Sequence, residues 1–148
     1  MIYTNSDGGA RGNPGPGAIG VIIRDNKTIL TRYSQMIGQR VTNNVAEYEA
    51  LIKALELAKN ITSDELTCIL DSELVVKQLL GEYKVKHPNL LELFLKVQKL
   101  QENFKKITYK HARREEEFQQ RADELVNQEL EKYGYPKSEY FRKKRFNK

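Results

Sequence analysis

A change in hydrophobic period limits the folds open to this chain. Three short apolar runs come first, and the short connections between them favour antiparallel strands at 1–5, 18–24 and 28–37. Apolar side chains then recur with a period near 3.6 over 42–60, which predicts a helix, before "ELTCIL" at 65–70 predicts a buried strand. A helix between strands implies a crossover, so we expect the fourth strand to lie parallel to the first or to a neighbour of it.

The second half of the chain continues this alternation of helices and strands. It predicts helices at 72–81 and 87–104, a strand at 106–112, and a last helix from about Phe118 to Tyr133. The order is therefore βββαβααβα. This order predicts an α/β fold in which helices cover the faces of one mixed sheet.

Size and composition suit one compact domain over residues 1–136. The chain has 148 residues, of which 39% are hydrophobic, so a single core needs no partner and a monomer is expected. Its one cysteine, Cys68, cannot form an internal disulfide and is expected to be buried. We find no signal-peptide pattern and no apolar run long enough to cross a membrane, which together predict a cytoplasmic protein with no membrane partner.

The net charge of +5 is concentrated in the last twelve residues, 137–148. Six of the 25 basic and one of the 20 acidic residues lie there, so residues 1–136 are neutral overall. This basic segment also contains aromatic residues, and two interpretations stay open. It binds nucleic-acid phosphates while its rings stack, or it is a solvated, flexible tail.

Two aspartates directly follow apolar strand segments. Asp7 comes after the first predicted strand and Asp71 after the fourth. We therefore expect each at the C-terminal end of its strand, where open α/β sheets bind ligands. If the two strands are parallel neighbours, the two carboxylates meet.

Two further carboxylates lie on predicted helices. Helical geometry places Glu47 opposite the polar face of its helix, so it points at the core or its rim. A buried carboxylate needs a partner, which is either a basic side chain or a metal ion. Asp123 lies early in the last helix, where it is either a favourable N-terminal charge or another ligand.

Converging carboxylates suit a hard cation, and Mg²⁺ above all prefers carboxylates, waters and phosphate oxygens. No CxxC or HExxH pattern supports zinc. Two such ions can activate a water and stabilise the leaving oxygen of a phosphodiester. The ions also reverse the local field, so a polyanion can approach an acidic pocket.

The ordered motifs resemble those of the type 1 ribonuclease H (ribonuclease HI) family. The matching segments are "DGGARGNPGPGAIGVII", "TNNVAEYEALIKALELA", "LDSELVVKQLLGEYKVK" and "RADELVNQELE". The resemblance implies the ribonuclease H-like fold, with five strands in the order 3-2-1-4-5, and a centre held by Asp7, Glu47, Asp71 and Asp123. It also implies two Mg²⁺ ions, with Mn²⁺ as a substitute, and endonucleolytic hydrolysis of the RNA strand of an RNA–DNA hybrid to 5′-phosphate and 3′-hydroxyl ends.

The glycine-rich stretch at 6–17 fits this interpretation. Gly8 and Gly9 would let the backbone approach the RNA strand, and the turn would present Asn13 to the minor groove, where 2′-hydroxyls are displayed. The alternative is a hairpin turn that needs positive φ at Gly15 and Gly17. A phosphate-binding P-loop is excluded, because no Gly-Lys-Ser/Thr follows.

By similarity, the segment before the first helix also contacts the hybrid. Asn43 and Asn44 would touch base edges or sugars in the minor groove. Arg40 and Thr42 match a pair that grips a phosphate of the DNA strand. Thr42 is also a natural helix cap, and both roles can hold together.

Two histidines lie near positions that the family uses. The family often has a catalytic histidine ten residues before the last aspartate, but position 113 is Arg. His111 fits that role only if this loop carries two extra residues, and its alternative is a surface histidine at a strand end. A third member of the phosphate pocket falls near His87 and Asn89, and its identity stays open.

The chain departs from many relatives in two other places. Glu73 replaces a glutamine and adds negative charge beside the centre. A basic helix and loop that holds the hybrid in many bacterial members is absent here. We hypothesise that Lys84, Lys86 and the basic segment 137–148 replace it.

Two other classes of function stay open. One is a different nuclease or strand-transfer enzyme on the same fold, such as a resolvase or integrase core. The other is a module that binds hybrids without cutting them. The "GNPGPG" and "TNN" segments argue against the first, and the full set of four carboxylates argues against the second.

Overall fold

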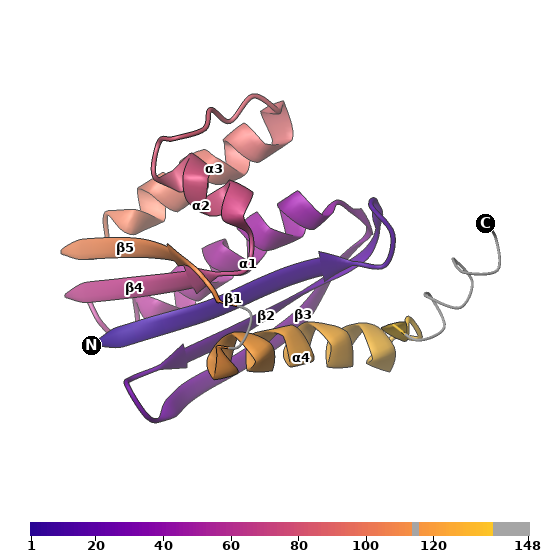
Figure 1. The fold of residues 1–148 in the computed structure, drawn as a ribbon, viewed down its shortest axis with the longest axis horizontal. Coiled ribbons are helices and arrows are strands. Elements are labelled where there is room, and N and C mark those ends of the chain that lie inside the picture. Colours follow the sequence, from indigo (N-terminus) through magenta and orange to yellow (C-terminus); the bar gives the residue numbers. More distant parts are fainter. Residues whose placement is uncertain (114–115, 138–148) are drawn as a thin grey trace.

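The computed structural model describes residues 1–113 and 116–137. They form one five-stranded sheet in the order β3-β2-β1-β4-β5 with helices on its faces, as predicted (Figure 1). The elements are β1 (Ile2–Ala10), β2 (Gly15–Arg24), β3 (Ile29–Val41), α1 (Asn43–Ala58), β4 (Glu65–Leu70), α2 (Glu73–Leu79), α3 (Pro88–Gln101), β5 (Lys106–His111) and α4 (Glu117–Lys132). No helix in the described ranges is long and apolar enough to span a membrane.

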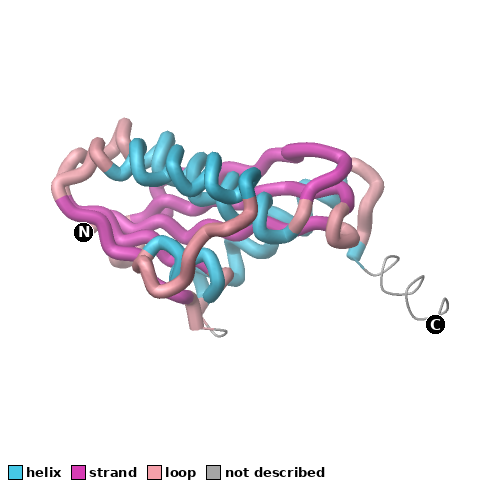
Figure 2. The backbone as a smooth tube through the Cα atoms, turned by 90° about the horizontal axis from the view of Figure 1, so that it is seen from above, coloured by secondary structure: helices cyan, strands magenta, loops and turns pink. Residues whose placement is uncertain are grey.

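The sheet is buried on both faces. Helices α1, α2 and α3 lie on one face and α4 lies on the other, and the strands twist along the molecule (Figures 1 and 2). Alternate residues of β2 serve the two sides: Val21 and Ile23 join the larger core, while Ala18 joins a smaller cluster with Val126 and Leu130 of α4. This two-sided burial explains why β2 is a continuous apolar run.

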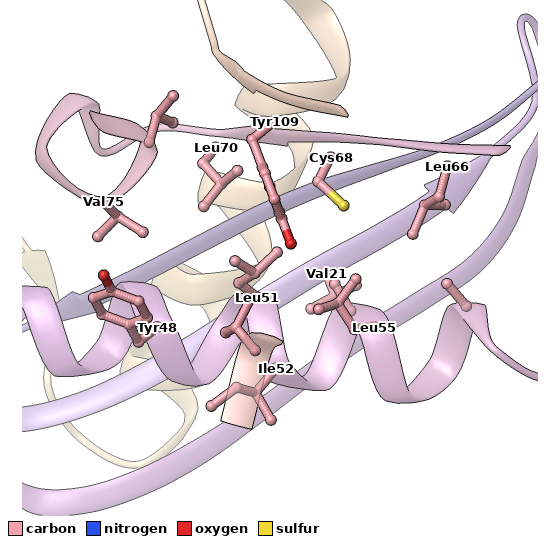
Figure 3. Close-up of a cluster of buried hydrophobic side chains, with 14 of the residues drawn as sticks. Val21, Tyr48, Leu51, Ile52, Leu55, Leu66, Cys68, Leu70, Val75 and Tyr109 are labelled. Atoms are coloured by element: carbon pink, nitrogen blue, oxygen red, sulfur yellow. The ribbon is translucent and has the colours of Figure 1, made fainter. Parts of the chain in front are cut away.

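The larger core fills the space between the sheet and α1. Side chains of α1 point toward those of β4 in the close-up of Figure 3, which labels Tyr48, Leu51, Leu55, Leu66, Cys68 and Leu70. Cys68 is fully buried, and burial raises the pKa of its thiol to about 12. This confirms its expected place in the core.

The first two strands are longer than predicted. β1 continues to Ala10 and pairs with β2 as far as Ala10↔Gly17, so most of the glycine-rich stretch is strand. The expectation that Asp7 ends its strand is therefore wrong. The parallel pairing of β1 with β4 does end at Ser6↔Leu70, so Asp7 and Asp71 both follow the last parallel pair.

The glycines of the hairpin are needed because there is no room for a side chain, more than because of their backbone dihedral angles. Only Gly12 in this stretch has a positive φ, so the interpretation that Gly15 and Gly17 need one is wrong. A Cβ on Gly15 would overlap the main chain of Arg11, and one on Gly17 would approach Val41 to 2.8 Å.

Two more glycines let helices approach the sheet from opposite sides. A Cβ on Gly8 would overlap the main chain of Ala46 in α1. A Cβ on Gly20 would overlap the carbonyl of Ala122 in α4. The missing side chain of Gly8 thus makes room for a helix of the same chain, and its predicted contact with RNA stays a prediction.

Gly8 and its neighbour form a matched pair for a stability test. A Cβ on Gly9 would meet Val126 at an ordinary 3.6 Å, and Gly9 has no positive φ. We expect Gly8→Ala to lower the free energy of unfolding by about 3 kcal/mol, because α1 must shift. We expect Gly9→Ala to change it by less than about 1 kcal/mol. Urea denaturation of both variants measures this, and equal effects would contradict the packing role of Gly8.

Candidate active site

The four predicted carboxylates lie around one pocket of about 330 Å³. Each comes from a different part of the fold: Asp7 from β1, Glu47 from α1, Asp71 from the residue after β4, and Asp123 from α4. The sheet order brings Asp7 and Asp71 together, and the helices on its two faces supply the other two. The pocket thus gathers oxygen ligands from segments more than a hundred residues apart.

Glu47 is buried, with only 7% of its surface exposed. Its Oε1 accepts the main-chain N–H of Gly8 at 3.0 Å, while its Oε2 has no hydrogen-bond partner. No ion pair with a lysine or arginine is found for it among the described residues, so the alternative of a salt bridge lacks support. Burial raises the pKa of Glu47 to about 7.

Asp7 lies beside Glu47 and is 5% exposed. Burial raises the pKa of Asp7 well above its ordinary value, and the neighbouring carboxylates of Glu47 and Asp123 raise it further. Two buried acids in contact cannot both carry a full charge without a compensating cation. A cation bound beside them would favour the charged form of both acids.

The other two carboxylates are open to solvent. Asp71 and Asp123 are both exposed on the rim of the pocket. Asp123 lies in the second turn of α4, which begins at Glu117, and the effect of a helix terminus fades within the first turn. A purely helix-stabilising role for Asp123 therefore loses its basis.

The donor set fits a hard divalent cation. All four side chains offer oxygen, and the unpartnered Oε2 of Glu47 is a buried acceptor without a donor. Within the described residues, no group of three or more acidic, histidine or cysteine side chains is already arranged to hold a metal ion. A cation here would complete its shell with waters and substrate oxygens, which is how Mg²⁺ is usually bound.

A buried polar network, which the sequence analysis did not identify, fixes the start of α4 on the sheet. The Nδ2 of Asn5 donates to Glu116 at 2.8 Å and to Gln119 at 3.1 Å, while its Oδ1 accepts from Arg24. Gln119 in turn donates to the carbonyl of Ser6 at 2.8 Å. The network ends one residue before Asp7 and one helical turn before Asp123, so it sets their separation.

Arg24 completes that network from β2. Its guanidinium lies 4.6 Å from the ring centre of Tyr3 and 4.2 Å from that of Phe118, and it forms an ion pair with Glu116 at 3.6 Å. The available signal was a charged residue, Arg24, at the end of the apolar run of β2, together with Asn5 within β1. It pointed to a buried partner without saying which one.

The predicted minor-groove residues lie in the hairpin and at the start of α1, beside the pocket. The Oδ1 of Asn13 accepts the N–H of Asn43 at 3.0 Å, and the Oδ1 of Asn43 accepts the N–H of Ala10 at 3.1 Å. These two side chains therefore fasten the hairpin to the start of α1. Gly9 and Asn44 also line the pocket.

The predicted phosphate-binding pair lies where β3 leads into α1. Arg40 and Thr42 are both exposed there. The side chain of Thr42 accepts from Val45 at 3.2 Å, which confirms its role as the helix cap. His87 caps α3 through its Nδ1, which accepts from Asn89 at 3.2 Å.

His111 ends β5 beside the pocket and is exposed. Its Nε2 lies 3.0 Å from the carbonyl oxygen of Asp71, so the ring contacts the main chain of a predicted ligand. Residues 114–115 of the following loop lie outside the described residues. Glu73 begins α2 and pairs with Lys77 at 3.0 Å, and it is not among the residues that line the pocket.

Comparison with known protein families and curated proteins gives consistent matches. A family described as reverse transcriptase-like matches residues 5–129. A bifunctional protein of Mycobacterium tuberculosis is 41% identical over 132 residues, which are 88% of this chain and 35% of that protein. Ribonuclease HI of Halobacterium salinarum is 37% identical over 131 residues, 88% of this chain and 64% of that protein. The chain thus spans about a third of the first relative and under two thirds of the second.

Solved structures agree with these matches. RNase H1 of Halobacterium salinarum superposes with a TM-score of 0.82 at 36% identity, over 88% of this chain and 98% of that one. LC11-RNase H1, isolated from compost by a metagenomic approach, was solved in complex with an RNA/DNA hybrid. That complex superposes with a TM-score of 0.83 at 43% identity, over 90% of this chain and 99% of that one.

The raised pKa of Glu47 predicts how the metal-free protein responds to pH. A carboxyl group whose folded pKa is raised contributes stability below its ordinary pKa, near 4.5, and loses it as pH rises through the folded pKa of about 7. In EDTA at pH 8, we expect Glu47→Gln to raise the free energy of unfolding by about 1 to 3 kcal/mol. Added Mg²⁺ should stabilise the wild type and much less the variant.

Urea denaturation between pH 5 and 8, with EDTA or Mg²⁺, measures both effects. Glu56→Gln is the matched control, because Glu56 lies on the same helix with its side chain 43% exposed. A Glu47→Gln protein that is less stable than the wild type at pH 8 in EDTA would show that the charged carboxylate stabilises the fold.

Proposed function

The chain belongs to the ribonuclease H family, and on this premise we propose that it is a metal-dependent endoribonuclease that hydrolyses the RNA strand of RNA–DNA hybrids. Cleavage would leave 5′-phosphate and 3′-hydroxyl ends. The observation that carries this proposal is the pair of buried carboxylates, Asp7 and Glu47, which lie beside each other while the Oε2 of Glu47 has no hydrogen-bond partner. The hybrid bound to LC11-RNase H1 supports the choice of substrate.

The four carboxylates would hold two divalent cations, Mg²⁺ by preference and Mn²⁺ as a substitute. When bound, such ions activate a water molecule and stabilise the leaving oxygen of the phosphodiester. Glu47 and Asp7 offer buried oxygens at the base of the pocket, whereas Asp71 and Asp123 offer exposed oxygens at its mouth. Substrate phosphate can therefore enter from the exposed side.

The rim of the pocket would recognise the hybrid. We assign minor-groove contacts to Gly8, Gly9, Asn13, Asn43 and Asn44, because the hairpin and the start of α1 are fastened together there. Since the carbonyl oxygens of Asn13 and Asn43 are already engaged, their amide N–H groups are the atoms available to a 2′-hydroxyl or a base edge.

Two flanking contacts complete this assignment. Arg40 and Thr42 would bind a phosphate of the DNA strand at the exposed end of β3. His111 would assist by holding the main chain of Asp71, because its ring contacts that carbonyl.

Cleavage of an end-labelled RNA–DNA hybrid tests the proposed function. With Mg²⁺ or Mn²⁺ we expect internal cuts in the RNA of the hybrid, and no cuts in single-stranded RNA or duplex DNA. EDTA and Asp71→Asn should both abolish the reaction, because each removes part of the metal centre. Glu73→Gln, outside the pocket lining, is the matched control and should retain activity.

Each failure of this assay has a distinct meaning. Cuts in duplex DNA would favour a strand-transfer enzyme on the same fold. Tight binding of the hybrid by a folded protein that cuts nothing would favour a binding module. A His111→Ala protein with an unchanged rate would remove His111 from the assigned site.

We also propose that basic residues outside the pocket hold the hybrid. Lys84 and Lys86 are exposed between α2 and α3, and Lys137 lines the carboxylate pocket. The rest of the basic segment, residues 138–148, lies outside the described residues. Together with Lys137, this segment contains six lysines and arginines, and they account for the positive net charge of a chain whose residues 1–136 are neutral overall.

Removal of residues 137–148 tests this second proposal. Binding through phosphates releases counterions, so the deletion should raise KM roughly three- to tenfold near physiological salt and leave kcat nearly unchanged. A variant that replaces only the lysines and arginines of this segment with glutamine separates charge from length. An unchanged KM at moderate salt would exclude this role.

A further inference from the structure

Arg11 joins three segments of the chain beside the acidic pocket. It lies in the turn between β1 and β2, where its main-chain N–H donates to the carbonyl of Pro16 at 2.8 Å. Its Nε donates to the carbonyl of Tyr135 at 3.0 Å, and its Nη2 donates to the Oδ1 of Asn127 at 2.9 Å. The hairpin, α4 and the segment after α4 thus meet at one guanidinium.

This contact decides which way the amide of Asn127 faces. A guanidinium only donates hydrogen bonds, so Asn127 must present its carbonyl oxygen to Arg11. Its amide nitrogen then faces the other way, where it donates to the Oδ2 of Asp123 at 3.3 Å. Asp123 and Asn127 are four residues apart on α4, a spacing that places them on one face of the helix.

We propose that Arg11 and Asn127 are positioning residues for Asp123. Arg11 orients the Asn127 amide, and that amide restrains one oxygen of the exposed Asp123 carboxylate while the other oxygen stays available to a cation. The proposal rests on the metal role assigned to Asp123 above. Groups that orient a metal ligand in this way usually contribute to the affinity of the metal.

The end of α4 is held by the same arginine. Gly134 has a φ of 94° and ends the helix, after which the N–H of Tyr135 donates to Leu130 at 2.8 Å. The hydroxyl of Tyr135 donates to Gln39 of β3 at 2.9 Å. With Gln119 fixed on the sheet at the other end, the helix cannot rotate freely, so Asn127 and Asp123 stay directed at the hairpin.

Metal binding by purified full-length variants tests the proposal directly. Calorimetric titration with Mn²⁺ should show about tenfold weaker binding for Asn127→Ala, and weaker binding also for Arg11→Gln. The double variant should bind no more weakly than Asn127→Ala alone, because the two residues act in series. Arg11→Lys keeps the positive charge and can still donate a hydrogen bond, so it should bind Mn²⁺ more tightly than Arg11→Gln does.

Arg121→Gln is the matched control. Arg121 also lies on α4 and pairs with Glu117 at 3.2 Å, but it is exposed and is not part of the pocket lining. Its Mn²⁺ affinity and hybrid cleavage should equal those of the wild type. Asn127→Ala binding Mn²⁺ as tightly as this control would overturn the proposal, as would independent and additive effects of Arg11→Gln and Asn127→Ala.

A second readout needs neither metal nor substrate. In metal-free protein, the NMR signals of the Asn127 side-chain amide should shift and exchange faster with solvent in Arg11→Gln, while those of Asn103 stay in place. Unchanged Asn127 signals would overturn the proposal. A wild type that cuts no hybrid and binds no Mn²⁺ would instead remove the proposed function, and the NMR comparison would still decide whether Arg11 orients Asn127.

Discussion

The close approach of α1 to β1 at Gly8 is the contact on which the rest of the site depends. Without a Cβ at this position, the main chain of the helix lies directly on the strand, and Glu47 reaches the N–H of Gly8. Glu47 is thereby buried beside Asp7, and burial raises the pKa of both acids. The fold therefore contains an electrostatic cost that a bound cation would remove.

The other elements bring ligands to this buried pair. β4 ends where its parallel pairing with β1 ends, which leaves Asp71 next to Asp7. α4 approaches the opposite face of the sheet over Gly20 and carries Asp123 to the same pocket. Side-chain hydrogen bonds hold both ends of α4: Gln119 bonds the sheet near its start, and Arg11 bonds Tyr135 just after its end. The geometry of the pocket thus follows from two glycine contacts and two polar anchors.

Most of the fold could be predicted from the sequence because hydrophobic period differs between strands and helices. The order of elements, the sheet order and the buried face of α1 follow from it together with the family resemblance. The lengths of β1 and β2 could not be predicted, because glycines such as Gly9 have no side-chain pattern to show which face they occupy. Their strand structure comes from pairing across the hairpin, as in Gly9↔Ala18.

In the candidate site, too, some residues could be predicted from the sequence and others could not. Residue type and motif order indicated the four carboxylates, and the structure places all four around one pocket. The partners that hold them were not predictable, because a contact such as that between Asn5 and Glu116 joins residues 111 positions apart. The same holds for Arg11 and Asn127, where neither residue is unusual in its local segment. Tertiary hydrogen bonds of this kind have no local sequence signature.

The central claim is that Asp7 and Glu47 are buried together because cations bind them. The most direct test is anomalous scattering from Mn²⁺ in crystals of the Asp71→Asn protein with an RNA–DNA hybrid. The account predicts a Mn²⁺ peak within about 2.5 Å of carboxylate oxygens of both Asp7 and Glu47, beside a phosphate of the RNA strand. Mn²⁺ bound elsewhere, or a basic side chain in contact with Glu47, would contradict it.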